Sequence, residues 1–362
     1  MTVSTRSADL SDLTTLGVGG PVRELIETDS EREFIDAIRA ADSDGTPLLV
    51  IGGGSNLVVD DEGFDGVVIR DVRDGFTVPD HSACAGVTLT VPAGTRWDEV
   101  VAHCTDNRLK GVEALSGIPG STGATPVQNV GAYGQEVSET IATVRVWDRE
   151  RSRVRTMPLF DLKFGYRTSL LKRSMLADPA DPATPWFPTP RYVVLDVTFQ
   201  LRVAQLSEPI RYAELARTLD IAVGERALLP DVRSAVLGLR AGKGMVLDPT
   251  DPDTRSAGSF FTNPVLTDDE AATLPEDAPR FAAGDGLVKT SAAWLIEQAG
   301  FSKGYGMPGP AALSTKHTLA LTNRGGATAG DVLTLARTVR DGVAERFGIT
   351  LVPEPVLVGA AL

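Results

Sequence analysis

The sequence predicts an α+β protein in which two small α/β parts are followed by a C-terminal portion of mixed helix and strand. Three observations predict it. Strand and helix patterns alternate over residues 31–69, apolar residues alternate with polar ones after residue 141, and helical spacing dominates after about residue 230. A chain of 362 residues is also long enough for two or three domains with cores of their own.

The first α/β part begins with a capped helix. Ser30 followed by Glu33 is a capping pattern that predicts a helix over 31–42. The apolar run 47–51 predicts a strand that leads into a glycine-rich turn, and 67–69 predicts another strand. This alternation is typical of a small α/β unit.

The second part is predicted to be mainly β. A strand over 88–91 precedes an amphipathic helix in which we expect Trp97 and Cys104 to face the core. Alternating apolar residues then predict further strands over 144–147, 154–157 and 192–199. The proline-rich segment 178–190 predicts an extended surface loop between the last two of these strands.

The C-terminal portion is predicted to contain three helices and a final strand. Helical spacing indicates helices over 229–239, 291–299 and 331–347, the last two closed by Gly300 and Gly348. The apolar run 356–358 predicts the strand.

Composition narrows the class of protein. Hydrophobic residues make up 42% and charged residues 23%, as in ordinary soluble globular proteins. A formal charge of −13 argues against nucleic acid or an anionic membrane as a partner. Cys84 and Cys104 are too few for a disulfide framework, and neither a signal peptide nor a membrane-spanning run is visible. We therefore expect a cytoplasmic protein. We also expect it to act as a monomer, although composition does not itself decide this.

Two glycine-rich turns are the most informative motifs. The first, 52–56, follows the predicted strand 47–51, and the second extends over 116–134. Glycine reaches positive φ and lets backbone N–H groups approach a ligand, and successive N–H groups form anion sites that commonly hold a pyrophosphate. Tight turns in a β-rich protein are the alternative interpretation, but turn chemistry does not require so many small residues in the second stretch.

Several familiar motifs are absent from the sequence. The first turn lacks the third glycine of a dinucleotide-binding fingerprint. The segment 238–244 is one residue short of a P-loop and has Gly244 where a hydroxyl residue should hold Mg²⁺. Three histidines (His81, His103 and His317) without metal-ligand spacing indicate no metal site.

Ser259 is a candidate for chemistry because it lies between a glycine and two aromatic residues, Phe260 and Phe261. Apolar neighbours exclude water and strengthen any hydrogen bond that the hydroxyl makes. The sequence around it has no nucleophile-elbow pattern and no histidine partner nearby, so a proton donor or substrate anchor is favoured over a nucleophile. A buried serine in a turn is the alternative.

Two charged residues are further candidates. Arg167, close to Gly165, offers a guanidinium suited to a carboxylate or phosphate, although an ordinary surface arginine explains the pattern equally well. Glu354 lies between Pro353 and Pro355, whose fixed φ angles restrict the direction of its side chain. Taken alone, it remains a loop glutamate.

Together these segments resemble the UDP-N-acetylenolpyruvoylglucosamine reductases (the MurB family), flavoenzymes that complete UDP-N-acetylmuramate in peptidoglycan precursor synthesis. The resemblance extends from about Thr14 to Gly359. It rests on the joint occurrence, in order, of the segments 15–21, 52–56, 117–134, 166–167, 258–264, 294–297 and 353–355.

The resemblance implies an FAD-binding domain of the vanillyl-alcohol-oxidase (PCMH) type in two α/β parts, 1–71 with 351–362 and 72–228. A third, substrate-binding α+β domain is expected over 229–350. FAD is expected to be bound noncovalently, consistent with the lack of histidine in 15–21 and 52–56. The residues implied to bind it are Gly52, Gly53, Gly54, Ser55, Asn56, Ile118, Pro119, Gly120, Ser121, Gly123, Ala124, Gln128, Asn129, Gly131, Ala132 and Tyr133.

The implied reaction has two halves. NADPH reduces FAD and leaves, and a UDP-sugar enolpyruvyl ether then receives a hydride at C3. By the family's pattern, Ser259 donates a proton to C2, while Arg167 and Glu354 act on the carboxylate. Glu354 must donate a hydrogen bond to do so, and we expect it to be protonated or to act through a water.

Three further residues are implied to contact the substrate. Tyr212 matches the tyrosine that covers the substrate diphosphate, and Lys243 and Asn263 match substrate-side positions.

Two other functions remain open from the sequence. One is another flavoprotein of the same fold, an oxidase of a sugar or alcohol, which would consume oxygen without NADPH. The other is a nucleotide-sugar-binding regulator without catalysis. Ser259, Arg167 and Glu354 argue against the regulator, because binding alone does not require a proton donor.

Overall fold

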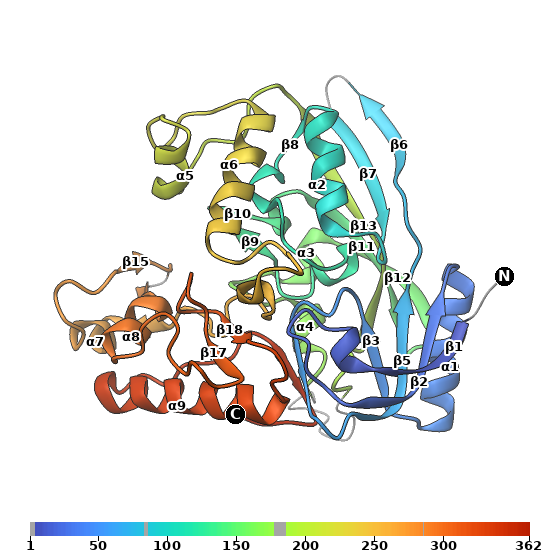
Figure 1. The fold of residues 1–362 in the computed structure, drawn as a ribbon. Helices are drawn as coiled ribbons and strands as arrows, with labels where there is room; N and C mark the ends of the chain where they lie inside the picture. Colours follow the sequence, from blue (N-terminus) through green and yellow to red (C-terminus); the bar gives the residue numbers. More distant parts are fainter. Residues whose placement is uncertain (1–3, 83–85, 177–185, 285) are drawn as a thin grey trace. The chain divides into compact units, whose positions relative to one another are not determined.

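A computed structural model describes residues 4–82, 86–176, 186–284 and 286–362 (Figure 1). Cys84 and residues 178–185 of the proline-rich segment lie outside this range. The chain divides into two compact units: the first comprises Met1–Ala8, Val22–Gly53 and Asp65–Ala241, and the second comprises Asp9–Pro21, Gly54–Phe64 and Gly242–Leu362. The three predicted domain ranges stay predictions.

The first unit contains a four-stranded sheet covered by a capped helix. Its strands are β1 (Ser4–Asp9), β2 (Pro21–Thr28), β5 (Phe64–Asp71) and β3 (Leu48–Ile51), in that order. Helix α1 (Glu31–Asp44) begins at Ser30, whose hydroxyl accepts from the N–H of Glu33 at 3.3 Å and donates to its carboxylate. The predicted helix and the parallel strands β3 and β5 are confirmed, whereas β1 and β2 were not predicted.

A larger antiparallel sheet completes the first unit. Its order is β12 (Arg153–Pro158), β11 (Ile141–Asp148), β13 (Tyr192–Val203), β7 (Gly86–Pro92) and β6 (Thr77–Ser82), with β8 (Leu109–Lys110) paired to the end of β13. Helix α2 (Trp97–Asp106) packs against this sheet through Trp97 and Cys104, both fully buried as predicted. Trp97 contacts Phe199 of β13, with ring centroids 5.8 Å apart.

Helix α1 joins the two sheets. Phe34, Ile35 and Ile38 on its buried face contact residues of both β5 and β13 in one hydrophobic cluster. At the edge of this cluster, Glu31 pairs with Arg145 of β11 at 2.8 Å, and Arg145 also pairs with Asp196 of β13. The two α/β parts of the first unit therefore share one core and one ion network.

The segment 186–190 covers the free edge of the four-stranded sheet at β3. The hydroxyl of Thr189, which is buried, accepts from the N–H of Val50 at 2.7 Å and donates to the carbonyl of Leu48 at 2.9 Å. Arg149 fixes the segment through the carbonyl of Thr189 and through a two-oxygen contact with Asp42 of α1.

Smaller elements complete the first unit. Helices α5 (Ala213–Thr218) and α6 (Leu229–Gly242) pack together near the 3₁₀ turn 113–115. Most of the P-loop-like segment 238–244 is the last turn of α6, so it forms no phosphate-cradling loop. The remaining elements are α3 (Leu159–Leu162), α4 (Leu170–Arg173), and the hairpin β9 (Gly131–Ala132) and β10 (Gln135–Glu136).

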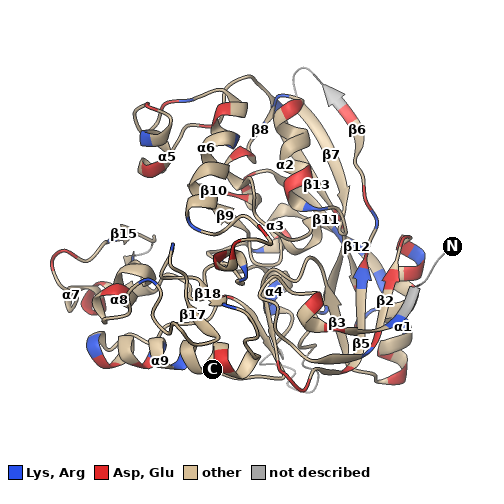
Figure 2. Cartoon of the chain, in the orientation of Figure 1, with Lys and Arg blue, Asp and Glu red and all other residues tan. Residues whose placement is uncertain are grey.

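The second unit is built around one long helix, α9 (Ala329–Phe347), which begins at a complete capping box of Thr328 and Asp331 and ends at Gly348. Its buried face contacts α8 (Ala292–Gln298) and the hairpin of β17 (Ala311–Leu313) and β18 (Leu321–Asn323). The predicted helices here are confirmed within two residues. In Figure 2, Lys and Arg are interspersed with Asp and Glu along α1 and α9.

Two further sheets belong to the second unit. One is three-stranded, in the order β14 (Val265–Thr267), β16 (Leu287–Lys289) and β15 (Phe281–Ala282), beside the short helix α7 (Asp268–Ala272). The other pairs β4 (Leu57–Val59) in parallel with β19 (Val356–Val358), the predicted final strand. Across the described ranges, no helix is long and apolar enough to cross a membrane.

A buried carboxylate fixes the polar loop 248–257 in the second unit. Asp253 accepts from the N–H and hydroxyl of Thr315, at 2.9 and 2.5 Å, and from the guanidinium of Arg324 at 2.6 Å. Burial raises the pKa of the Asp253 carboxyl, but the hydrogen bonds from Thr315 and the charge of Arg324 outweigh it and hold the pKa below its ordinary value. The charged form is therefore the one that stabilises this loop.

We expect Asp253→Asn to lower the free energy of unfolding at pH 7 by about 2 kcal/mol, the scale of hydrogen bonds to a charged group. Because the folded-state pKa is depressed, this contribution is present above the ordinary aspartate value of about 3.9 and is lost as the pH falls through the folded-state value. Chemical denaturation from pH 7 to pH 3 should therefore show a smaller loss of stability in the variant than in the wild type. Asp277→Asn, on an exposed turn, is the control, and parallel pH profiles for all three proteins would contradict the assignment.

Candidate active site

The two predicted glycine turns meet inside the first unit. A Cβ on Gly53 would lie 2.7 Å from the Cα of Gly120, and a Cβ on Gly52 would lie 2.2 Å from the hydroxyl oxygen of Ser121. Real Cβ contacts do not come so close, so only glycine allows the turn after β3 to approach the second stretch. The structure thus brings together two segments whose proximity the sequence did not show.

The second stretch is held at the start of α2. The N–H of Trp97 donates to the carbonyl of Gly120 at 3.0 Å, and the N–H of Gly123 donates to the carbonyl of Ala93 at 2.9 Å. At the beginning of the stretch, the N–H of Gly117 donates to the carboxylate of Asp98 at 2.6 Å. The path of this loop is therefore fixed by backbone and carboxylate acceptors around one helix end.

Asp98 also binds helix α6. Its two oxygens accept from the two terminal nitrogens of Arg233 at 2.7 and 2.8 Å. Burial raises the pKa of Asp98, but the hydrogen bonds from Arg233 and Gly117 lower it further, so that the pKa lies below its ordinary value. Sequence reasoning did not single out Asp98, because carboxylates are common in the first turn of helices, where they interact favourably with the helix dipole.

Arg167 lies at the tip of a tight turn closed by two hydrogen bonds between Gly165 and Thr168. Its backbone φ of 52° is in the left-handed region, which residues other than glycine rarely adopt. Its guanidinium donates to the carbonyl of Gly131 at 2.7 Å and to that of Asn129 at 3.4 Å. Arg167 is thus placed against the second glycine stretch.

Asn129 links the same stretch to this turn. Its φ is 49°, a conformation that asparagine tolerates better than most residues. Its amide donates to the carboxylate of Glu136 at 2.7 Å and to the carbonyl of Gly165 at 3.2 Å, and its oxygen accepts from the N–H of Ser138. The buried side chain therefore fixes the backbone around Gly131.

Tyr212 lies at the start of α5 with about half of its surface exposed. Its ring meets Tyr133 edge to face, with centroids 5.6 Å apart. The covering residue predicted for the substrate thus contacts a residue of the predicted FAD-binding stretch.

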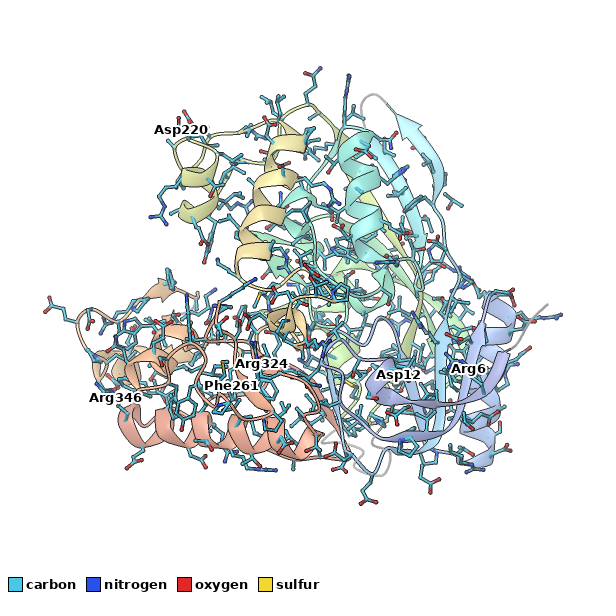
Figure 3. The ribbon with its side chains drawn as sticks, viewed as in Figure 1. Arg6, Asp12, Asp220, Phe261, Arg324 and Arg346 are labelled. Carbon is cyan, nitrogen blue, oxygen red and sulfur yellow. The ribbon has the colours of Figure 1, made fainter. Side chains whose placement is uncertain are left out.

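In the second unit, Ser259 and Glu354 lie on two paired segments. The N–H of Glu354 donates to the carbonyl of Phe260 at 2.9 Å, and the N–H of Thr262 donates to that of Val352 at 3.0 Å. Phe260 and Phe261, the latter labelled in Figure 3, are fully buried and pack edge to face. Gly258 has a φ of 74°, so the turn that carries Ser259 needs glycine.

The end of the first glycine turn belongs to the same unit. The side-chain amide of Asn56 donates to the carbonyl of Glu354 at 3.3 Å, and the N–H of Val356 donates to the carbonyl of Asn56 at 3.0 Å. Two predicted FAD-binding residues, Ser55 and Asn56, are therefore next to the segment that carries Glu354.

The other predicted substrate residues lie in the second unit too. Asn263 follows the Ser259 segment, and its side-chain oxygen accepts from the N–H of Ala292 at the start of α8 at 3.0 Å. This contact of Asn263 is structural, and sequence reasoning missed it. Lys243 is partly buried just after α6.

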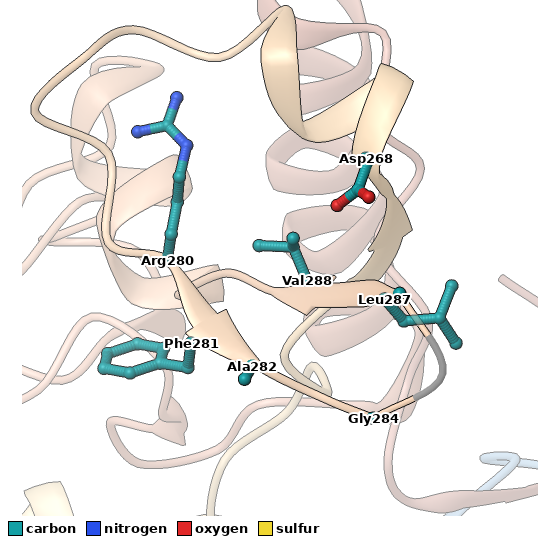
Figure 4. A pocket seen from close by; sticks show the side chains of 8 residues that line it. Asp268, Arg280, Phe281, Ala282, Gly284, Leu287 and Val288 are labelled. Carbon is teal, nitrogen blue, oxygen red and sulfur yellow. The ribbon is translucent and has the colours of Figure 1, made fainter.

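A cavity of about 370 Å³ opens elsewhere in the second unit, on β15 and β16 (Figure 4). None of the predicted site residues lines it. Arg280 at its edge donates to backbone carbonyls, those of Ala271 and Leu274 among them, and its guanidinium points away from Asp268. Among the residues described, no group of histidine, cysteine and carboxylate side chains is arranged to hold a metal ion.

Two family models match this chain. Residues 23–157 match an FAD binding domain, and residues 248–358 match the C-terminal domain of UDP-N-acetylenolpyruvoylglucosamine reductase. Together they agree with the predicted fold, in which an FAD-binding domain of the PCMH type precedes a C-terminal α+β domain.

The similarity to known proteins covers nearly the whole chain. The UDP-N-acetylenolpyruvoylglucosamine reductase of Thermobifida fusca is 54% identical, over 99% of this chain and 98% of its own. That of Streptomyces coelicolor is 53% identical, over 98% of this chain and 90% of its own. The crystal structure of the Thermus caldophilus enzyme, at 24% identity, matches the fold with a TM-score of 0.63 over 99% of this chain and all of the other.

The contact between the glycine turns gives a testable prediction. In Gly53→Ala the new methyl group meets the backbone of Gly120, so the turns must separate, and we expect FAD to bind at least 10-fold more weakly. Gly52→Ala should cost less, because it meets the rotatable hydroxyl of Ser121. Gly238→Ala, on α6 with open space around it, is the control. Titration of apoprotein by flavin fluorescence measures the effect, and equal affinities for Gly53→Ala and Gly238→Ala would contradict it.

Proposed function

This chain belongs to the UDP-N-acetylenolpyruvoylglucosamine reductase family, and we propose that Ser259, Arg167 and Glu354 carry out the family's reaction in it. The chain is an FAD-dependent oxidoreductase that reduces the enolpyruvyl ether of UDP-N-acetylglucosamine to UDP-N-acetylmuramate, with NADPH as the electron donor. The observation that supports the residue assignment most is the pairing of the Ser259 and Glu354 segments through Phe260.

The predicted FAD-binding residues fit that cofactor. They include no carboxylate, and at the turn contact Gly52 lies against the hydroxyl of Ser121 and Gly53 against the backbone of Gly120. A pyrophosphate requires N–H and hydroxyl donors and no opposing negative charge, which is what these turns and Ser121 offer. FAD, when bound, supplies the redox chemistry that carries the electron pair from NADPH to the substrate.

Ser259 is the proposed proton donor. Addition of a hydride at C3 of the enol ether leaves negative charge at C2, and the product requires a proton there. The Ser259 hydroxyl, on a glycine-dependent turn with two buried aromatic rings directly after it, is held in an apolar setting that strengthens its hydrogen bonds. A fixed donor of this kind is general-acid catalysis.

Arg167 and Glu354 are the proposed partners of the substrate carboxylate. Charge from C2 spreads into this group, and cationic or hydrogen-bonding groups that are already in place stabilise it without reorganisation. The carbonyls of Asn129 and Gly131 orient the Arg167 guanidinium, while the main-chain bonds of Glu354 to Asn56 and Phe260 fix its segment. Glu354 is proposed to donate its hydrogen bond when protonated or through a water.

Tyr212, Lys243 and Asn263 are proposed to bind the UDP moiety. Tyr212 is supported by its half-exposed ring beside Tyr133, and a phenol can donate to a diphosphate oxygen. We further propose that the protein acts as a monomer in the cytoplasm. We propose neither nucleic acid nor a membrane as a partner, since the formal charge of the protein is −13. Sedimentation equilibrium at micromolar concentration tests the monomer, and a dimer mass would contradict it.

Ser259→Ala should leave FAD content and the reduction of the flavin by NADPH near wild type. Reoxidation by the enolpyruvyl substrate should slow by about 10²-fold or more, the usual range for a general acid. Stopped-flow absorbance of the flavin separates the two half-reactions. Ser234→Ala, exposed on α6, is the control, and equal slowing of both half-reactions in Ser259→Ala would show a structural role instead.

Arg167→Lys keeps the charge but loses the planar fork that contacts two carbonyls. Transition-state stabilisation should weaken by roughly 1.5–3 kcal/mol, mostly in turnover, because charge on the carboxylate grows during the reaction. Steady-state kinetics with varied substrate gives the split between kcat and KM. Arg217→Lys, exposed on α5, is the matched control, and unchanged turnover in Arg167→Lys would exclude the proposed role.

Tyr212→Phe removes one hydroxyl and keeps the ring against Tyr133. Loss of one hydrogen bond to a charged group should raise the dissociation constant of the UDP-sugar substrate by about 5- to 30-fold. Reduction by NADPH should be nearly unchanged, since that half-reaction does not involve the UDP-sugar. Titration followed by flavin absorbance tests this, with Tyr192→Phe of β13 as the control, and unaltered affinity would mean that Tyr212 is not the covering residue.

A further inference from the structure

Thr15 lies at a junction between the segments that carry the proposed site residues of the second unit. Its hydroxyl donates to the carbonyl of Ser256 at 2.6 Å, and its N–H donates to the carbonyl of Gly54 at 3.1 Å. Ser256 is three residues before Ser259, and Gly54 is two residues before Asn56. One threonine therefore connects the end of the first glycine turn with the turn that carries Ser259.

These bonds close a ring. Asn56 donates to the carbonyl of Glu354, Glu354 donates to that of Phe260, and the short segment from Phe260 back to Ser256 leads to Thr15 again. Every member belongs to the second unit. The side-chain members of the ring are Thr15 and Asn56, and Thr15 has no proposed role so far.

The Ser259 turn is held at both of its ends. On one side, the N–H of Phe260 donates to the carbonyl of Leu319 at 2.7 Å. On the other, Ser256 forms an isolated bridge with Thr322, and its carbonyl accepts from Thr15. Between these ends Gly258 has positive φ, and its N–H donates to the hydroxyl of Ser256 at 3.2 Å, so hydrogen bonds at Ser256 and Phe260 restrain the backbone there.

We propose that Thr15 is a positioning residue for Ser259: its hydroxyl fixes the Ser256 carbonyl and so sets the direction of the Ser259 side chain. The proposal rests on the proposed function of Ser259 as proton donor. A proton donor must be held within a few tenths of an ångström of its productive position, and the restraint on its turn is the part that Thr15 supplies.

The test uses the full-length holoenzyme and the variant Thr15→Val, which keeps the branched shape and removes the hydroxyl. Reduction by NADPH should stay within about 2-fold of wild type, whereas reoxidation by the enolpyruvyl substrate should slow by about 10-fold, the scale of one hydrogen bond. The loss should appear in kcat and not in KM. Thr15→Ser keeps the hydroxyl and should restore reoxidation to within about 3-fold of the wild-type rate.

Thr14→Val is the matched control. The hydroxyl of this neighbouring buried threonine donates to the carbonyl of Val18 at 3.0 Å, within its own turn. The variant loses the same group and does not touch Ser256, so both half-reactions should stay near wild type. FAD content and melting temperature, measured for every variant, report purely structural damage.

The double variant Ser259→Ala/Thr15→Val gives the decisive result. If Thr15 acts through Ser259, the second substitution should slow reoxidation no further once the serine hydroxyl is gone. Multiplied losses, or equal slowing of both half-reactions in Thr15→Val, would overturn the proposal. If Ser259→Ala itself has no selective effect, the proposed function fails instead, whatever Thr15→Val does. Should Thr15→Val not fold with FAD, Thr15→Cys, whose thiol is a weak donor, takes its place with the same expected pattern.

Discussion

The approach of Gly53 to Gly120 is the contact on which the first unit depends, because at this point two stretches of main chain touch with no side chain between them. Close packing of backbone on backbone leaves no room for adjustment, so the end of β3 and the start of α2 must be held accurately by their own neighbours. Trp97 and Asp98 hold one side of the contact, and the shared core of α1 with both sheets holds the other. The ion network of Glu31, Arg145 and Asp196 supports this contact, since it joins helix α1 to strands β11 and β13 of the larger sheet.

In the second unit, several short irregular segments lie outside the sheets and must be fixed in another way. They are fixed by single hydrogen bonds between main-chain and side-chain groups, each weak alone but arranged in a ring through Thr15, Asn56 and Glu354. The buried carboxylate of Asp253 anchors the preceding loop in the same way, with three donors on one group. Cooperative arrangements of this kind hold a backbone more firmly than the separate bonds would suggest.

Local patterns predicted the longer helices and the central strands, because caps and periodicity depend on neighbouring residues. Ser30 begins α1 as its capping pattern predicted, and the alternation in β13 was visible directly. β1 escaped notice because its sequence, Ser-Thr-Arg-Ser-Ala-Asp, shows no apolar alternation. Ser259 and Glu354 were singled out by their immediate neighbours in the sequence, and their catalytic roles were assigned through the family resemblance. The pairing of their segments through Phe260 could not be foreseen, since contacts between distant segments leave no local period. The hydrogen bond from the N–H of Ala292 in α8 to Asn263 was invisible for the same reason.

The hydroxyl of Thr189 has a consequence for how this protein behaves at high concentration. A sheet edge presents unpaired N–H and carbonyl groups that a strand from another molecule can extend, which is the usual first step toward intermolecular aggregation. Here the N–H of Val50 and the carbonyl of Leu48 are both taken by one side chain, which Arg149 keeps in place. One threonine thus occupies the position that a fifth strand would take beside β3, and these two groups of the β3 edge are closed to pairing with a second copy.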